Sequence, residues 1–142
     1  MTSTLVSLPS KEVLKPIAYK FGIRLIVVFG SVVRGTTNAE SDIDLGVLTN
    51  RPLTFNQRLK LWETLSPLFN VEVDLVVLNH ANPVLAFEAA STGDLLFENK
   101  SNTWDNWKSF SFRQYWDTEK FRNDLRKFIT RRAEEMSHAA VE

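Results

Sequence analysis

Residues 27–44 read V-V-F-G-S-V-V-R-G-T-T-N-A-E-S-D-I-D and decide the fold predicted for this chain. They start at the end of an apolar, β-branched run, 24–29, which is typical of a buried strand. Asp42 and Asp44 then head a second strand-like run, 43–48. Because side chains alternate along a strand, the two aspartates share one face while the apolar residues between and after them face a core.

Two carboxylates on one face repel each other unless a positive charge lies between them. Mg²⁺ is the natural candidate, since it takes oxygen ligands and is commonly held by one or two carboxylates together with substrate phosphates. The sequence therefore predicts a magnesium site at Asp42 and Asp44 whose remaining ligands come from a nucleotide.

The pair Gly30-Ser31, ten residues before Asp42, fits the phosphate end of that nucleotide. Gly30 has no Cβ and lets phosphate oxygens approach the backbone, and Ser31 offers a hydroxyl and an N–H. Arg34 can add a charged fork to the same phosphates. A D-x-D pair alone usually marks a solvated turn, so the prediction rests on its combination with Gly-Ser at a fixed spacing.

A third carboxylate, Asp74, interrupts the apolar run 71–78. A charge within such a run is costly unless it is paired or binds a metal. If this strand lies beside the one that carries Asp44, Asp74 can share the metal site and act as a base toward an acceptor hydroxyl. Glu72 is expected to be a solvated rim carboxylate, and His80 a loop residue, because Mg²⁺ prefers oxygen ligands.

The spacing G-S-x10-D-x-D resembles the signature of the nucleotidyltransferase superfamily related to DNA polymerase beta. The variant G-S-x-x-R-G, from Gly30 to Gly35, is similar to its minimal bacterial branch, and residues 73–88 resemble the MntA-type antitoxins that accompany HEPN ribonuclease toxins. The resemblance implies a minimal nucleotidyltransferase fold of the α/β (α+β) class, with a small mixed sheet flanked by helices. It also assigns Asp42, Asp44 and Asp74 to catalysis with two Mg²⁺, and Gly30, Ser31 and Arg34 to the nucleotide.

As a function, the resemblance implies an antitoxin that transfers AMP from ATP to a hydroxyl, expected to be a tyrosine, of a cognate HEPN toxin. The expected assembly is a hetero-oligomer with that toxin. Two alternatives stay open: an antitoxin that acts by binding alone, and a nucleotidyltransferase with another acceptor, such as an aminoglycoside or an RNA end. Changing Asp42 and Asp44 to asparagine would separate catalysis from binding.

Composition limits the other possibilities. With 142 residues the chain is expected to form one domain, and its formal net charge of zero argues against nucleic acid as an obligatory ligand. It has no cysteine for disulfides or thiolate metal sites. Without an apolar run of about 20 residues or a leader-like N-terminus, a cytoplasmic protein without a membrane partner is expected.

We predict a nucleotidyltransferase core in residues 1–100 and a C-terminal helical extension of the same domain in residues 101–142. Further helices are predicted from Ser10 to Gly22, from Thr54 to about Phe69, and from Val84 to Ser91. The buried side of the second is expected to consist of Leu59, Leu61, Trp62, Leu65 and Leu68. The extension carries eight aromatic residues, and fraying is expected after Glu134. The extension either covers the sheet or forms an aromatic and arginine-rich docking surface for a protein.

Overall fold

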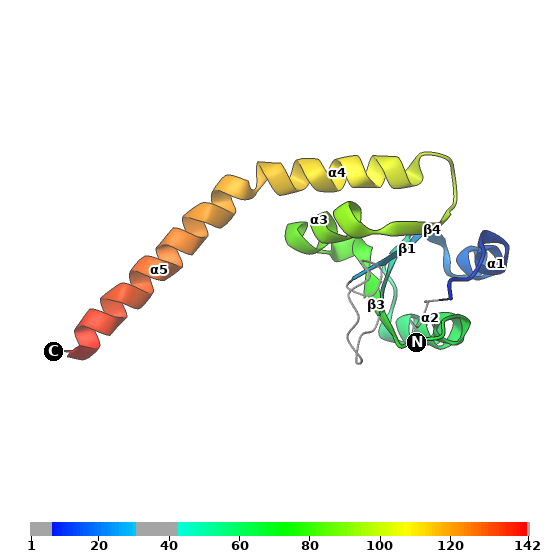
Figure 1. The fold of residues 1–142 in the computed structure, drawn as a ribbon, viewed down its shortest axis with the longest axis horizontal. Coiled ribbons are helices and arrows are strands. Elements are labelled where there is room, and N and C mark those ends of the chain that lie inside the picture. The colour runs from blue at the N-terminus through cyan, green and yellow to red at the C-terminus, as the bar shows by residue number, and fades with distance from the viewer. Residues whose placement is uncertain (1–6, 31–42, 142) are drawn as a thin grey trace, which may run out of the picture.

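The structure is a computed structural model that describes residues 7–30 and 43–141. In this part of the chain four strands form one mixed sheet in the order β3-β2-β1-β4, with helices on both faces (Figure 1). The strands are β1 (Ile23–Phe29), β2 (Ile43–Thr49), β3 (Val73–Val77) and β4 (Asp94–Glu98). The helices are α1 (Lys11–Phe21), α2 (Phe55–Leu65), α3 (Pro83–Thr92), α4 (Thr103–Asp117) and α5 (Glu119–Val141). The predicted α/β class with a C-terminal helical extension is confirmed.

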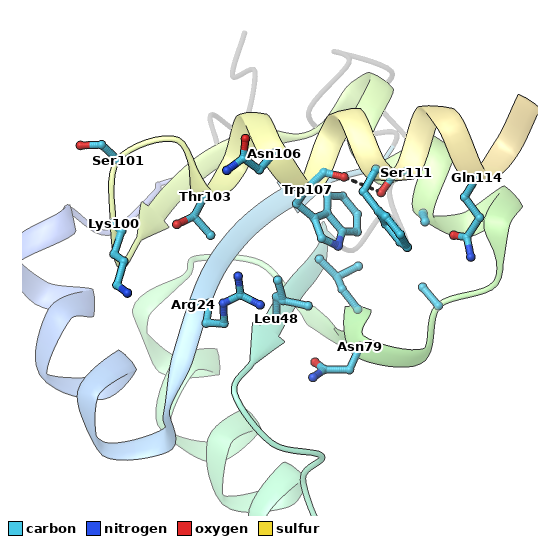
Figure 2. Close-up of a pocket in the computed structure, with 14 residues that line it drawn as sticks. Arg24, Leu48, Asn79, Lys100, Ser101, Thr103, Asn106, Trp107, Ser111 and Gln114 are labelled. Carbon is cyan, nitrogen blue, oxygen red and sulfur yellow. Dashed lines mark hydrogen bonds between the residues drawn. The ribbon is translucent and has the colours of Figure 1, made fainter.

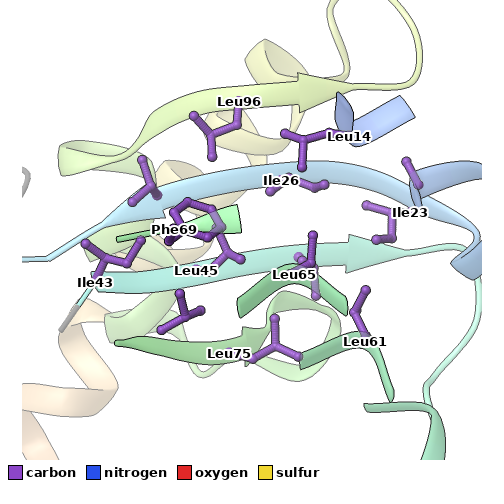
Figure 3. Packing of buried hydrophobic residues seen from close by; sticks show 14 residues of the cluster. Leu14, Ile23, Ile26, Ile43, Leu45, Leu61, Leu65, Phe69, Leu75 and Leu96 are labelled. Carbon is purple, nitrogen blue, oxygen red and sulfur yellow. The ribbon is translucent and has the colours of Figure 1, made fainter. Parts of the chain in front are cut away.

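Strand β1 lies at the centre and is apolar on both faces because helices cover it from both sides. It pairs antiparallel with β2 and with β4, whereas β2 pairs parallel with β3. One face packs against α1 and α2 through Leu14, Leu61 and Leu65 (Figure 3). The other packs against α3 and α4 through Ala89 and Trp104.

Local signals in the sequence set the helix ends. Ser10 accepts a hydrogen bond from the Val13 N–H at the start of α1, and Gly22 ends that helix in the left-handed region at φ 67°. Thr54 and Gln57 form a capping box at the start of α2. Asn82 caps α3, whose first residue is Pro83. The starts predicted at Ser10 and Thr54 are confirmed.

Helix α2 departs from the prediction in two ways. It ends at Leu65 and continues only as the short 3₁₀ turn Ser66–Leu68, because Pro67 has no N–H to extend the α-helical hydrogen bonds. Trp62, expected on the buried side, is 41% exposed. The buried positions are Leu61 and Leu65, so the apolar stripe of this helix is wider than the surface that covers it.

Trp62 instead ties α2 to the edge strand β3. Its indole Nε1 donates a hydrogen bond of 2.8 Å to the carbonyl of Val73, and Nη2 of Arg58 donates one of 3.4 Å to the carbonyl of Leu75. An open strand edge exposes unpaired backbone groups that another strand can join. These two side chains occupy the acceptors on either side of Asp74 and fix that stretch of β3.

The C-terminal extension consists of two helices with different surroundings. Helix α4 packs on α3 and buries Trp104 in the core, so this half covers the sheet, which is the first of the two alternatives that the sequence left open. Helix α5 extends away from the body (Figure 1) and continues to Val141, so the expected fraying after Glu134 is wrong. None of the helices formed by the described residues combines the length and apolar character needed to cross a membrane.

We expect Trp62→Phe to lower the free energy of unfolding by about 1 kcal/mol. Phenylalanine keeps an aromatic ring at this position but cannot donate the hydrogen bond to the Val73 carbonyl. Urea unfolding followed by circular dichroism measures the change. Phe55→Leu is the control, since Phe55 is 78% exposed and its replacement should change stability by less than about 0.5 kcal/mol. Equal losses in the two variants would show that the indole bond does not stabilise β3.

Candidate active site

Asp44 and Asp74 occupy matching positions on neighbouring strands. Each is the second residue of its strand, and the parallel register places Asp44 directly opposite Asp74. Neighbouring strands lie about 4.8 Å apart, so the two side chains emerge side by side from one face of the sheet. Asp44 is half-buried and Asp74 is exposed. The two strands are adjacent, as the sequence argument required.

The alternation of side chains identifies the face. Ile43 and Leu45, on either side of Asp44, are buried in the core beneath α1 and α2. Val73 and Leu75, on either side of Asp74, are buried in the same core. Both carboxylates therefore belong to the face that carries α3 and α4, at the end of the sheet where β1 finishes and β2 begins.

Gly30 follows β1 and touches this pair. Phe29 is opposite Asp44 in the antiparallel register. The next residue, Gly30, has φ 112°, a backbone conformation that residues other than glycine rarely adopt. A Cβ on Gly30 would lie 2.9 Å from Oδ2 of Asp44. Glycine is thus required here because it leaves room for the Asp44 carboxylate, a reason separate from the phosphate access predicted from the sequence.

Three of the predicted site residues, Ser31, Arg34 and Asp42, lie outside the described residues. Among the residues that are described, no three His, Cys, Asp or Glu side chains gather as a metal site. The described part of the candidate site is therefore the pair Asp44 and Asp74 with Gly30. Carboxylates offer only acceptor oxygens, which suits a hard divalent cation.

The two residues that the sequence placed near the site behave differently. The backbone carbonyl of Glu72 accepts a hydrogen bond of 3.1 Å from the Ile43 N–H and so helps to align β3 with β2. Its side chain is exposed. His80 lies in the turn Leu78–His80, beyond the opposite end of β3, and is also exposed. The described geometry therefore gives His80 no place beside the aspartates.

A hollow of about 200 Å³ adjoins Asp74 at the edge of the sheet, between β3 and the exposed side of α2. Phe55, Arg58, Leu59 and Trp62 border it. Their contribution was not foreseen, because the helical periodicity of 55–65 marks Leu59 and Trp62 as core positions. The strand that carries Asp74 is accordingly open to solvent on its outer side.

A larger cavity of about 600 Å³ lies beneath α4 at the opposite end of the sheet (Figure 2). The described residues of its wall include Arg24, Asn79, Lys100 and Trp107, and none of them carries a carboxylate. Leu48, which also lines it, is opposite Leu25 at the far end of β2 from Asp44. This cavity is therefore separate from the paired aspartates, and the residues described in its lining offer no carboxylate to hold Mg²⁺.

Comparison with known proteins gives one family and several relatives. The model of the Polymerase beta, Nucleotidyltransferase family matches residues 12–102. The protein adenylyltransferase MntA of Shewanella oneidensis is 36% identical over 75 residues, which are 53% of this chain and 54% of that protein. The chain thus spans about half the length of this curated relative.

Solved structures with the same fold include a toxin-antitoxin with AMP-PNP, at a TM-score of 0.70 and 23% identity, covering 86% of this chain and 99% of that one. A second is described as tri-AMPylated Shewanella oneidensis HEPN toxin in complex with MNT antitoxin. Its TM-score is 0.62 at 22% identity, and the match covers 84% of this chain and 98% of that one. At these identities the likeness shows the fold.

We expect Gly30→Ala to weaken the affinity for Mg²⁺ and ATP by about tenfold or more, because the new Cβ displaces the Asp44 carboxylate. Gly22→Ala is the matched control: it also has a positive φ, but its Cβ would meet Asn50 at an ordinary 3.6 Å. Titration calorimetry measures the affinity and urea unfolding the stability. Both variants should lose about 1 kcal/mol of stability or more. Equal affinities for the nucleotide in Gly30→Ala and Gly22→Ala would contradict the role given to Gly30.

Proposed function

Since this chain belongs to the Polymerase beta nucleotidyltransferase family, we propose that it transfers AMP from ATP to a hydroxyl of a partner protein. The observation that carries the proposal is the in-register pair Asp44 and Asp74, next to Gly30 at the end of β1. Such a pair supplies the two functions that nucleotidyl transfer needs from carboxylates: metal binding and proton acceptance.

The partner that we propose is a HEPN ribonuclease toxin, and the acceptor is a tyrosine hydroxyl. Support comes from the Shewanella relative, which is named a protein adenylyltransferase, and from the solved complex described as containing tri-AMPylated HEPN toxin. The structure with AMP-PNP favours ATP as the donor. Modification of the toxin would neutralise it, and the two proteins would form a hetero-oligomer in the cytoplasm.

The donor set fits Mg²⁺, because Asp44 and Asp74 present carboxylate oxygens from adjacent strands. In the proposal Asp42, Asp44 and Asp74 would hold two Mg²⁺, and Gly30, Ser31 and Arg34 would hold the triphosphate. When bound, the two ions would neutralise charge on the triphosphate and lower the pKa of the attacking hydroxyl. The half-buried position of Asp44 suits the more enclosed ligand, and the exposed Asp74 suits contact with an incoming acceptor.

The bonds exchanged in the reaction are few. The acceptor hydroxyl oxygen attacks the α-phosphorus of ATP and forms a phosphodiester bond with AMP. The bond from the α-phosphorus to the oxygen that bridges to the β-phosphate breaks, and pyrophosphate leaves with that electron pair. Asp74 takes the hydroxyl proton, since it lies on the open edge strand where an acceptor can reach it.

We expect Asp44→Asn and Asp74→Asn each to slow AMP transfer by about a thousandfold or more, because several kcal/mol of transition-state stabilisation would be lost. The assay incubates the purified chain with Mg²⁺, ATP and the protein encoded beside it, and follows the intact mass of both. Each AMP adds about 329 Da to the acceptor. Asp94→Asn is the control: it removes an exposed carboxylate at the same end of the sheet and should change the rate by less than about threefold.

The same variants separate the two alternatives. A stable complex without any mass gain, with protection from the toxin retained in Asp44→Asn, would favour an antitoxin that acts by binding. Adenylylation of an aminoglycoside, with the neighbouring protein unmodified, would favour a small-molecule acceptor. Either result would overturn the proposal of protein adenylylation.

A further inference from the structure

Helix α5 exposes a series of large apolar side chains. Phe121, Leu125, Phe128, Ile129 and Met136 are between 47% and 69% exposed. From Glu119 to His138 every residue of this helix is exposed except Arg122, which is half-buried. Isolated apolar residues are normal on a protein surface, but a contiguous patch marks a contact site.

These five residues, which we call the α5 stripe, lie on one side of the helix. At 100° per residue they fall within an arc of about 100°, which is the width of the buried face of an ordinary amphipathic helix. Arg132 falls within the same arc, between Ile129 and Met136. A helix of this length extends for about 34 Å. Because α5 leaves the body (Figure 1), the described residues of this chain do not cover the stripe.

The charge around the stripe is basic. From Phe121 to Met136, over the whole length of the stripe, the helix has five basic and three acidic residues, although the whole chain has a formal net charge of zero. Arg126 borders the stripe on one side and Arg132 lies within it. The other side carries both signs, with Lys127 and Arg131 next to Asp124 and Glu135. Because the stretch keeps a net positive charge, an acidic partner suits this surface better than a second copy of α5.

The joint between α4 and α5 sets the direction of the helix. The Arg122 guanidinium lies 3.9 Å from the centre of the Tyr115 ring, and its Nη1 donates a hydrogen bond of 2.9 Å to the Tyr115 carbonyl. The same nitrogen also contacts the Thr118 hydroxyl. The Tyr115 ring stacks on Phe87 of α3 with centroids 4.0 Å apart. These contacts connect α5 through α4 to α3 and hold the stripe in a defined position.

We propose that the α5 stripe is the docking surface for a helix of the acceptor protein, which presents apolar side chains flanked by Asp and Glu. This inference rests on the proposed function and names the part of the chain that recognises the partner. Docking on α5 raises the local concentration of the acceptor hydroxyl at the aspartates. The stripe then determines how tightly the acceptor binds, while Asp44 and Asp74 determine how fast bound acceptor reacts.

The test uses the full chain and the protein encoded beside it. One variant carries Phe121→Gln with Phe128→Gln, because glutamine keeps helix propensity and removes the apolar contact. A second carries Lys127→Glu with Arg131→Glu and tests the charge. Tyr19→Gln is the matched control: Tyr19 is 91% exposed on α1, at the other end of the molecule (Figure 1). Circular dichroism checks that all variants keep the wild-type helix content.

Both α5 variants should raise the Kd of the complex and the KM for the acceptor by about tenfold or more. The kcat at saturating acceptor and the KM for ATP should stay within about twofold of wild type, as should all values for Tyr19→Gln. Unchanged Kd and KM in the α5 variants would overturn the docking assignment and leave the proposed function intact. Tight binding without AMP transfer by the wild type would reject the proposed function, while the Kd values would still decide the docking.

Two other results would also overturn the docking assignment. One is a wild-type dimer that the Phe121→Gln, Phe128→Gln variant converts to a monomer with unchanged affinity for the neighbouring protein, which would assign the stripe to a second copy. The other is binding to vesicles of anionic phospholipid that the α5 variants lose while their Kd for the protein is unchanged. Failure of the wild type to bind the neighbouring protein would reject it directly.

Discussion

The parallel, in-register pairing of β2 with β3 is the constraint on which the candidate site depends. It is the parallel contact in a sheet whose other two described pairings are antiparallel, and it requires the crossover through α2. A shift of one residue in this register would turn Asp74 into the core and bring Val73 or Leu75 to the surface. The burial of the Val73 and Leu75 side chains fixes this register and therefore also keeps the two carboxylates next to each other.

Placing Asp74 on the edge strand satisfies two opposing needs. An acceptor must reach the carboxylate from solvent, yet an open strand edge invites pairing with other chains. Helix α2 meets the second need without blocking the first, because the side chains of Trp62 and Arg58 bind the carbonyls of Val73 and Leu75 along the strand. Asp74 points to the opposite face of the sheet from the α2 core and remains exposed.

Alternation and capping explain how much could be predicted from the sequence. The alternation in 43–48 and 71–78 predicted which residues share a face with Asp44 and with Asp74 on each strand, and the structure supplied the pairing of the two strands. Ser10, Gly22 and Thr54 marked helix ends through local hydrogen bonding. Helical periodicity failed for side chains whose burial depends on whether another element packs over them. It shows which side of a helix is apolar but not whether anything packs on it, so it placed Trp62 in the core and ended α5 too early. The space that Asp44 requires beside Gly30 depends on a contact between strands that no local pattern records.

The aromatic residues of the C-terminal extension have two separate roles, and the boundary between them is Thr118. Before it, Trp104 enters the core and Tyr115 stacks on Phe87, so this half belongs to the folding unit. After it, Phe121 and Phe128 have comparable apolar area but remain in solvent. Exposing such side chains on a basic helix gives the isolated chain no hydrophobic stabilisation. The arrangement is favourable only if another molecule buries them, and the fixed joint at Arg122 orders the helix before that molecule arrives, which lowers the entropy lost on binding.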